Sequence, residues 1–267
     1  MDTTPETSAE FLEIKKILEP LRAIFTRILS QSNIIMKYHY VCVDDAEHKA
    51  SGKPIKYTAY MQDTDLRTTV PGRIILWSEL PLKEQIGFLK LDYCVTTISI
   101  FSKQIEQLLT TIGAQAQWTF LDMQPATLYR IGEDTREYED PLHCAFIVRS
   151  RSGMELIADF TIEQYGYDDD CWLSTSENYM TRYAHPDQRR SERAMADREF
   201  LEDFAQRNNR VTGICLIIYE ICEQIDWETY HGLPEEERFA WLYGCVDGLA
   251  DLSRESIIRS YETTRLT

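Results

Sequence analysis

The stretch that decides the fold runs from His143 to Thr161 and reads HCAFIVRSRSGMELIADFT. Two runs rich in apolar residues, 143–149 and 154–159, flank the turn-like tripeptide Arg151-Ser152-Gly153. This pattern is typical of a β-hairpin. If the strands pair around Arg151–Ser152, His143 lies directly opposite Asp159, with both side chains on one face. A carboxylate in that place holds an imidazole in one tautomer and stabilises its protonated form.

A nucleophile for this pair comes from an earlier segment. Residues 92–112 carry one apolar stripe that predicts a helix, with Asp92 near its N-cap and Gly113 after its end. Cys94 then falls in the first turn, where unpaired backbone N–H groups favour a thiolate and stabilise an oxyanion. Cys144 competes as nucleophile, but strand alternation turns it away from His143, so we expect it in the core.

These segments resemble the three motifs of the transglutaminase-like superfamily: Tyr93-Cys94-Val95-Thr96, the strand that begins with His143, and Ile157-Ala158-Asp159-Phe160-Thr161, with Gln164-Tyr165-Gly166 beyond. The resemblance implies a papain-like core, in which a Cys-bearing helix packs on an antiparallel sheet. It also implies the catalytic roles of Cys94, His143 and Asp159.

The related arylamine acetyltransferase-type enzymes share the relay. Their Asp-Val-Gly signature is missing, because Phe160-Thr161 follows Asp159, and this favours the transglutaminase or hydrolase relatives. The aromatic residue that these relatives carry soon after the His is replaced by Ala145-Phe146. Gln85 and Trp77 are candidates for an oxyanion donor by their order alone.

The main elements are predicted in the order helix, helix, strands and helices, and this segregation indicates an α+β fold rather than alternating βαβ units. We expect a disordered tail over 1–8, a catalytic core with an N-terminal helix over 9–186, and a helical extension over 187–267 that packs on the core. Helices are predicted over 8–32, 92–112, 190–207, 210–225 and 234–261, and strands, besides the hairpin, over 38–43, 55–60, 73–77, 117–121 and 126–131.

Composition narrows the function classes. The net charge of −16 disfavours nucleic acid, because the electrostatic term in such binding would be repulsive. The basic cluster Arg189, Arg190 and Arg193 is interpreted as a solvated helix face. No apolar run is long enough to span a bilayer, and no secretory segment follows Met1, so we expect a cytoplasmic protein.

The cysteine and acidic patterns suggest no metal. The seven cysteines show no CxxC and no zinc-type spacing, so we expect reduced thiols and no structural metal. The triplet Asp168-Asp169-Asp170 lacks the alternating ligands of a calcium loop and is interpreted as a solvated loop. Near it, Gln164, Tyr165 and Trp172 are expected to line a substrate pocket.

The sequence therefore predicts cysteine-dependent acyl transfer or hydrolysis, without a cofactor, on an amide or thioester of a small molecule or peptide. Two alternatives stay open. One is a non-catalytic interaction protein on the same fold, which binds a basic partner. The other is a small-molecule cyclase or lyase that uses the pocket without a covalent step. The C-terminal helices are also the expected surface for a homo-oligomer.

Overall fold

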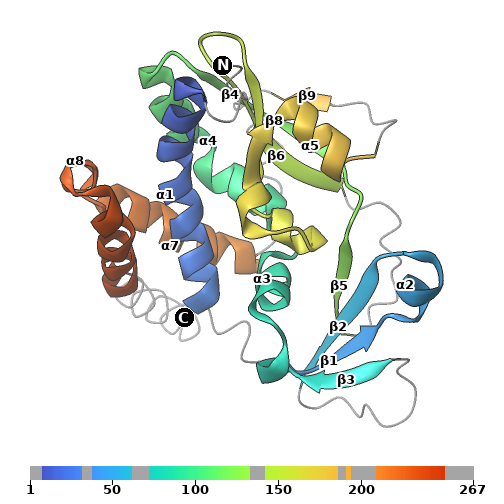
Figure 1. Ribbon diagram of the computed structural model, residues 1–267. Helices are drawn as coiled ribbons and strands as arrows, with labels where there is room; N and C mark the ends of the chain where they lie inside the picture. Colours follow the sequence, from blue (N-terminus) through green and yellow to red (C-terminus); the bar gives the residue numbers. More distant parts are fainter. Residues whose placement is uncertain are drawn as a thin grey trace.

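The computed structural model describes residues 8–31, 38–61, 72–132, 142–185, 191–193 and 209–249. Within them the chain is a mixed α/β protein with two sheets (Figure 1). The larger sheet has the order β8-β7-β6-β4-β9 and is antiparallel throughout. Its strands are β4 (Gln115–Asp122), β6 (Leu142–Arg149), β7 (Glu155–Ala158), β8 (Leu173–Thr175) and β9 (Ser191–Arg193).

The smaller sheet has the order β3-β1-β2-β5. Strand β1 is antiparallel to both β2 and β3, whereas β5 pairs with β2 in parallel. A short helix, α2 (Ala46–Ser51), connects β1 and β2. The strand bounds are β1 (Tyr38–Asp44), β2 (Ile55–Met61), β3 (Arg73–Leu76) and β5 (Thr127–Ile131).

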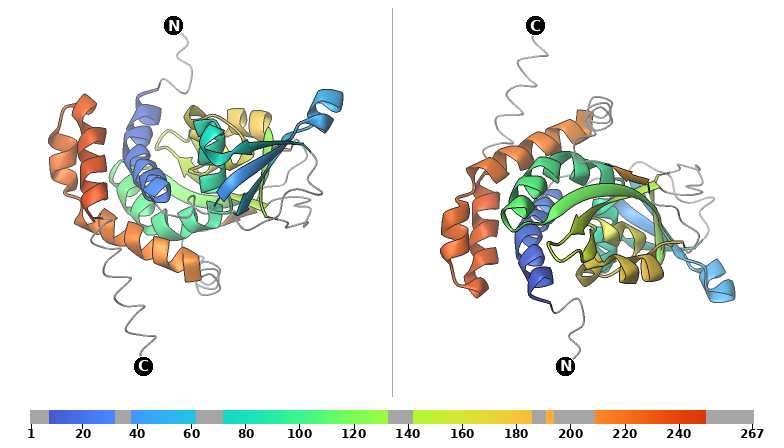
Figure 2. Two further views of the ribbon diagram at one scale, coloured as in Figure 1. Left: turned by 90° about the horizontal axis from the view of Figure 1, so that it is seen from below. Right: turned by 90° about the horizontal axis from the view of Figure 1, so that it is seen from above.

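Helices cover the larger sheet. Helix α4 (Cys94–Thr111) packs on β4 and β6, while α1 (Ala9–Gln31) and α7 (Asn209–Gln224) pack on α4. Figure 2 shows these helices layered on one side of the molecule and the small sheet projecting from the other. The remaining helices are α3 (Leu82–Lys90), α5 (Ser176–Tyr183), α8 (Trp227–Gly232) and a helical segment over 235–249.

One continuous hydrophobic core joins these layers. Phe160, next to the end of β7, contacts both Phe146 of β6 and Phe101 of α4, with ring centroids 5.6 Å apart in each case. Ile218 and Ile221 of α7 are fully buried in the same core. The helix that carries Cys94 is therefore clamped between the sheet and the outer helices.

The hairpin forms, but the predicted register is wrong by two residues on the partner strand. Phe146 pairs with Ala158 and Arg149 pairs with Glu155, so Asp159 is a diagonal neighbour of His143 and does not lie directly opposite it. The cause is the position of the turn, which is centred on Ser152: Ser150 N–H donates to Met154 O across it, and Gly153 has a φ of 89°. A glycine with positive φ is typical of a three-residue hairpin loop. A shift of two preserves the face of every side chain.

Other elements differ from the prediction at the C-terminal side. The helix predicted over 190–207 is wrong at 191–193, because Ser191–Arg193 pairs with β4 as an edge strand. The rest of that predicted helix, residues 250–261 of the last one and residues 1–7 of the predicted tail lie outside the described residues. Among the described helices, none is both long and apolar enough to cross a membrane.

Candidate active site

The hairpin brings His143 and Asp159 into contact. His143 Nε2 donates to Asp159 Oδ2 at 2.7 Å, and both side chains are fully buried. The carboxylate also accepts hydrogen bonds from the Tyr179 hydroxyl to Oδ2 (2.6 Å) and from the Thr161 N–H to Oδ1 (2.9 Å). Three donors from different elements thus fix its orientation. Because Nε2 is engaged by Asp159, Nδ1 is the ring nitrogen left for another partner.

Cys94 is the first residue of α4, with Tyr93 as N-cap. The residue before that N-cap, Asp92, has a φ of 63°, and its N–H donates to Gln164 Oε1 at 3.2 Å. Such a φ is uncommon outside glycine, and here it reverses the chain between α3 and α4. The reversal places Cys94 at the N-terminus of α4, where His143 and Cys144 are the neighbours that act on its thiol. Cys94 is 6% exposed.

The surroundings of Cys94 favour its thiolate. The pKa of Cys94 lies well below the ordinary thiol value, because the Cys144 side chain donates to it; burial opposes this effect, and His143 adds a hydrogen bond and a positive charge. The pKa of Cys144 is raised, first because its proton is shared with Cys94 and second because the side chain is buried. Cys144 is buried, as expected, but it is also a direct neighbour of the candidate nucleophile.

His143 carries the matching positive charge. Burial lowers its pKa, but the charge and hydrogen bond of Asp159, together with those of Cys94, outweigh burial and raise the pKa to about 10. Burial raises the pKa of Asp159 in turn, yet His143, Tyr179 and the Thr161 N–H hold it below the ordinary value. These directions favour a thiolate on Cys94, a positive charge on His143 and a negative charge on Asp159.

The residues predicted to line a substrate pocket are buried around this relay. Gln164 Nε2 lies 3.3 Å from His143 Nδ1 and donates to Thr161 Oγ1 at 2.8 Å. The Tyr165 ring packs edge-on against the His143 ring, with centroids 4.9 Å apart. Trp172 packs against Phe160 and carries the Arg22 guanidinium over its ring. In these positions the three residues contact the relay or the core beneath it.

The two candidates for an oxyanion donor belong to the region of the small sheet. Gln85 Nε2 donates to Leu80 O at 2.7 Å, and the Trp77 ring packs on Phe88. The N–H groups in the first turn of α4 belong to Cys94 itself and to the residues that follow it, and they are the alternative donors for an oxyanion.

Sequence reasoning missed Tyr179 and the roles of Cys144 and Gln164. Tyr179 lies on α5, and this helix was not predicted because eight residues are too few to show a periodic apolar pattern. Thr175 as a helix N-cap was the available signal, since its side chain accepts a hydrogen bond from the Asn178 N–H.

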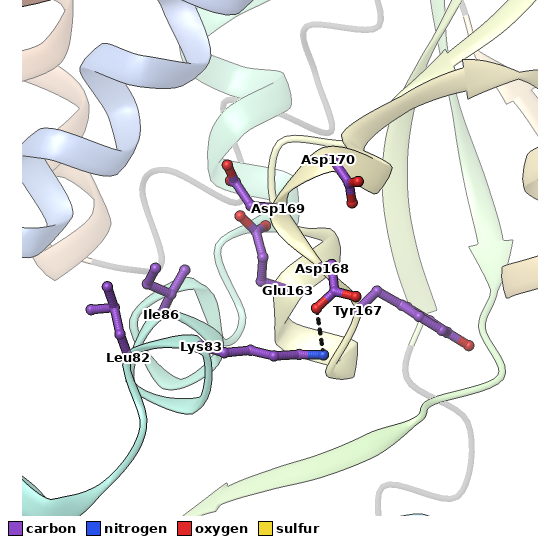
Figure 3. A pocket seen from close by; sticks show the side chains of 8 residues that line it. All are labelled: Leu82, Lys83, Ile86, Glu163, Tyr167, Asp168, Asp169 and Asp170. Atoms are coloured by element: carbon purple, nitrogen blue, oxygen red, sulfur yellow. Dashed lines mark ion pairs between the residues drawn. The ribbon is translucent and has the colours of Figure 1, made fainter.

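A pocket of about 460 Å³ lies between α3 and the segment that includes and follows the 3₁₀ helix η4 (Ile162–Tyr165), and no residue of the relay lines it (Figure 3). The acidic triplet contributes to its wall and forms ion pairs: Asp169 with Arg22 at 2.6 Å, and Asp168 with Lys83 at 2.7 Å. The pocket is lined by Leu82, Lys83, Ile86, Glu163, Tyr167, Asp168, Asp169 and Asp170.

Comparison with known proteins returns no relative. No family model matches the sequence, no curated protein matches it, and no solved structure matches the fold.

Proposed function

We propose that this protein is a thiol-dependent acyltransferase or hydrolase with the core of the transglutaminase-like enzymes. The observation that carries the proposal is the hydrogen-bonded pair of His143 and Asp159, with Cys94 beside it at the start of a helix that packs on an antiparallel sheet. Residues that are far apart in sequence meet in the order that nucleophile, base and orienting acid require.

In the proposed reaction, the Cys94 thiolate attacks the carbonyl carbon of an amide or thioester. The negative charge that develops on the oxygen is stabilised by the N–H groups in the first turn of α4. As the bond to the leaving nitrogen or sulfur breaks, the His143 imidazolium gives that atom its proton, and a thioester remains on Cys94. Water or an amine then attacks the thioester and loses a proton to His143, which restores the thiolate.

The same contacts support Asp159 as the orienting residue. Its carboxylate binds Nε2, which leaves Nδ1 as the ring nitrogen that can serve the thiol, and Tyr179 and Thr161 hold the carboxylate in place. None of these steps uses a cofactor.

A second function, a non-catalytic interaction protein, is favoured by one observation: the relay is almost closed to solvent, with Cys94 6% exposed and His143 and Asp159 fully buried. An enzyme must open above Cys94 to admit a carbonyl compound. An interaction protein needs no such opening.

Trapping of the acyl-enzyme separates the two functions. The native protein is incubated with p-nitrophenyl acetate and with a small alkyl thioester, and intact-mass spectrometry follows covalent acyl addition. We expect one acetyl group on Cys94 in the wild type, none on that residue in Cys94→Ser, and strongly slowed acylation in His143→Ala. Labelling that is absent, or that is equal in the wild type and His143→Ala, would support the interaction protein.

A further inference from the structure

Gln164 is a buried residue to which the proposed mechanism assigns no role, and its side chain meets three parts of the relay. Its Oε1 accepts a hydrogen bond from the Asp92 N–H, in the turn before α4, at 3.2 Å. Its Nε2 donates to Thr161 Oγ1 at 2.8 Å and lies 3.3 Å from His143 Nδ1. One buried amide group therefore joins the start of α4, the base and the loop after β7.

These hydrogen bonds fix which way the amide points. A backbone N–H can only donate, so the amide atom that faces Asp92 is the oxygen, and the NH2 group faces His143 and Thr161. The Thr161 hydroxyl can accept from this NH2 group, because its own hydrogen is directed to Asp159 Oδ1 at 3.3 Å. Rotation of the amide by half a turn would set two donors against each other at Asp92. The NH2 group is therefore held toward Nδ1.

The histidine ring presents the matching acceptor. His143 Nε2 faces a carboxylate oxygen of Asp159, which can only accept, so in the neutral ring the hydrogen is on Nε2 and Nδ1 has a free lone pair. The second hydrogen of the Gln164 NH2 group is placed to donate to that lone pair. At 3.3 Å this hydrogen bond is a long one, so a second partner can displace it.

The Cys94 thiol needs the same nitrogen. In the proposed mechanism Nδ1 takes the proton of Cys94, and the imidazolium then carries a hydrogen on both ring nitrogens. The Nδ1–H and the Gln164 N–H are in that state two donors that face each other, and a buried donor without an acceptor is unfavourable. Gln164 thus favours the neutral ring, whereas Asp159 favours the charged one.

The ionisable groups around His143 are Asp159 beyond β7, Cys94 on α4, Cys144 on β6, Tyr165 on η4 and Tyr179 on α5. Burial raises the pKa of both tyrosines well above the ordinary value, and the contact with Cys94 together with burial raises the pKa of Cys144. These three groups stay neutral while His143 titrates. The charges that act on the ring are those of Asp159 and Cys94.

We propose that Gln164 is a positioning residue that keeps His143 Nδ1 a hydrogen-bond acceptor and competes with the Cys94 thiol for it. This role rests on the proposed function, in which Nδ1 is the atom that receives the thiol proton. One proton moves in that step, from Sγ to Nδ1; the contact between Gln164 and Nδ1 breaks, and the amide keeps both of its hydrogens. Gln164 thereby restrains formation of the thiolate.

Nitrogen NMR on the full chain tests the contact without acyl chemistry. The protein carries Cys94→Ala, so that His143 titrates alone. The other four of its five histidines, none of them buried, are replaced by glutamine. An unprotonated ring nitrogen that accepts a hydrogen bond resonates upfield of a free one. In Gln164→Met we expect the Nδ1 signal of the neutral ring to move downfield, the Nε2 signal to stay, and the His143 pKa to rise by about one pH unit, the equivalent of one net hydrogen bond.

A second glutamine provides the control. Gln124→Met, at an exposed position after β4, should change neither the ring-nitrogen signals nor the pKa of His143. If Gln164→Met leaves Nδ1 and the pKa unchanged, the amide does not bond to Nδ1 and the proposal is wrong. If both ring nitrogens move, the substitution has loosened the pair of His143 and Asp159, and Gln164 has only a structural role. Gln164→Asn, whose amide is one methylene shorter, carries the same expectations should Gln164→Met fail to fold.

Alkylation by iodoacetamide connects the contact to the reactivity of Cys94. With Cys94 present, Gln164→Met should lower the pH midpoint of alkylation relative to the wild type, by up to about one pH unit, and leave the limiting rate at high pH unchanged. A midpoint that stays or rises, or a limiting rate that rises because the site has opened, would show that Gln164 does not compete with the thiol. A Cys94 that is inert in both proteins is a failure of the proposed function, whereas the NMR signals still report the contact at Nδ1.

Discussion

At the scale of single residues, the chemistry of the site rests on two shifted pKa values that oppose each other. In the folded protein the His143 pKa is raised to about 10 from 6.5, so its stabilising contribution is complete below about 6.5 and is lost as the pH rises through about 10. The Cys94 pKa is lowered, so its contribution is present above about 8.5, the value of a free thiol, and is lost as the pH falls through the folded pKa. Between about pH 6.5 and 8.5 the two contributions to the free energy of unfolding change with pH by equal and opposite amounts. The reason is that Cys94 and His143 together carry one proton in both the folded and the unfolded state.

This cancellation predicts the effect of Cys94→Ala on stability. In the variant only the titration of His143 still contributes. The free energy of unfolding of Cys94→Ala should therefore fall, relative to that of the wild type, as the pH rises from about 6.5 to 8.5, by up to about 1.4 kcal/mol per pH unit. Urea denaturation of both proteins at several pH values measures this difference. Parallel curves across the window would show that Cys94 is not a thiolate in contact with His143.

That His143 and Asp159 lie close together could be predicted from the sequence, because they occupy the ends of two paired strands, and Cys94 could be placed at a helix start. Their exact geometry could not be predicted. The register of the hairpin depended on where the turn is centred, which is Ser152, so that Ser150 and Met154 face each other across it. The contact of Cys144 with Cys94 depends on where α4 begins, and no alternation pattern contains that information.

At the scale of elements, the turn between α3 and α4 positions the nucleophile, and Asp92 is the residue whose backbone makes it. A left-handed φ is available to glycine without cost but penalises alanine by about 1–2 kcal/mol. Asp92→Ala should therefore be less stable than Asp92→Gly by about 1 kcal/mol, as measured by urea denaturation.

An exposed helical position in α4 provides the control for this comparison. At Glu106 the order should reverse, with Glu106→Ala more stable than Glu106→Gly by about 1 kcal/mol, because the helix interior penalises glycine. If alanine is the more stable substitution at both sites, Asp92 does not have the backbone conformation that the structure gives it.

Elements with long periodic patterns were predicted well, and short ones were not. The stripe over 92–112 corresponds to α4 (Cys94–Thr111), and the predicted helix 8–32 corresponds to α1 (Ala9–Gln31) in spite of Pro20. By contrast, Ser191–Arg193 forms a strand because β4 offers it an open edge, a tertiary contact that local propensity does not contain.

At the scale of the whole molecule, the C-terminal helix α7 belongs to the same core as the candidate site. Ile221 is fully buried among residues of the cluster that includes α1 and α4. Ile221→Ala should therefore destabilise the entire protein by about 2–5 kcal/mol, through lost burial and the cavity left behind. Gln224→Ala, an exposed change on the same helix, should stay within about 0.5 kcal/mol of the wild type.

Two probes followed together decide whether the core is one cooperative unit. Tryptophan fluorescence and Cys94 protection from alkylation should report the same urea midpoint in Ile221→Ala. If Cys94 stays protected after the fluorescence transition, α7 unfolds independently, and the division at residue 187 predicted from the sequence describes two separate units.

The proposed function depends most directly on the state of Cys94, and its pH-dependent alkylation measures that state. Native wild type and His143→Ala are treated with iodoacetamide over a range of pH, and mass spectrometry follows Cys94, with the half-buried Cys171 as internal reference. A relay predicts that Cys94 of the wild type reacts well below the value of about 8.5 for a free thiol, and that in His143→Ala its midpoint moves up toward that value. A Cys94 that does not react, or that reacts equally without His143, would contradict the catalytic function and leave the interaction protein as the better proposal.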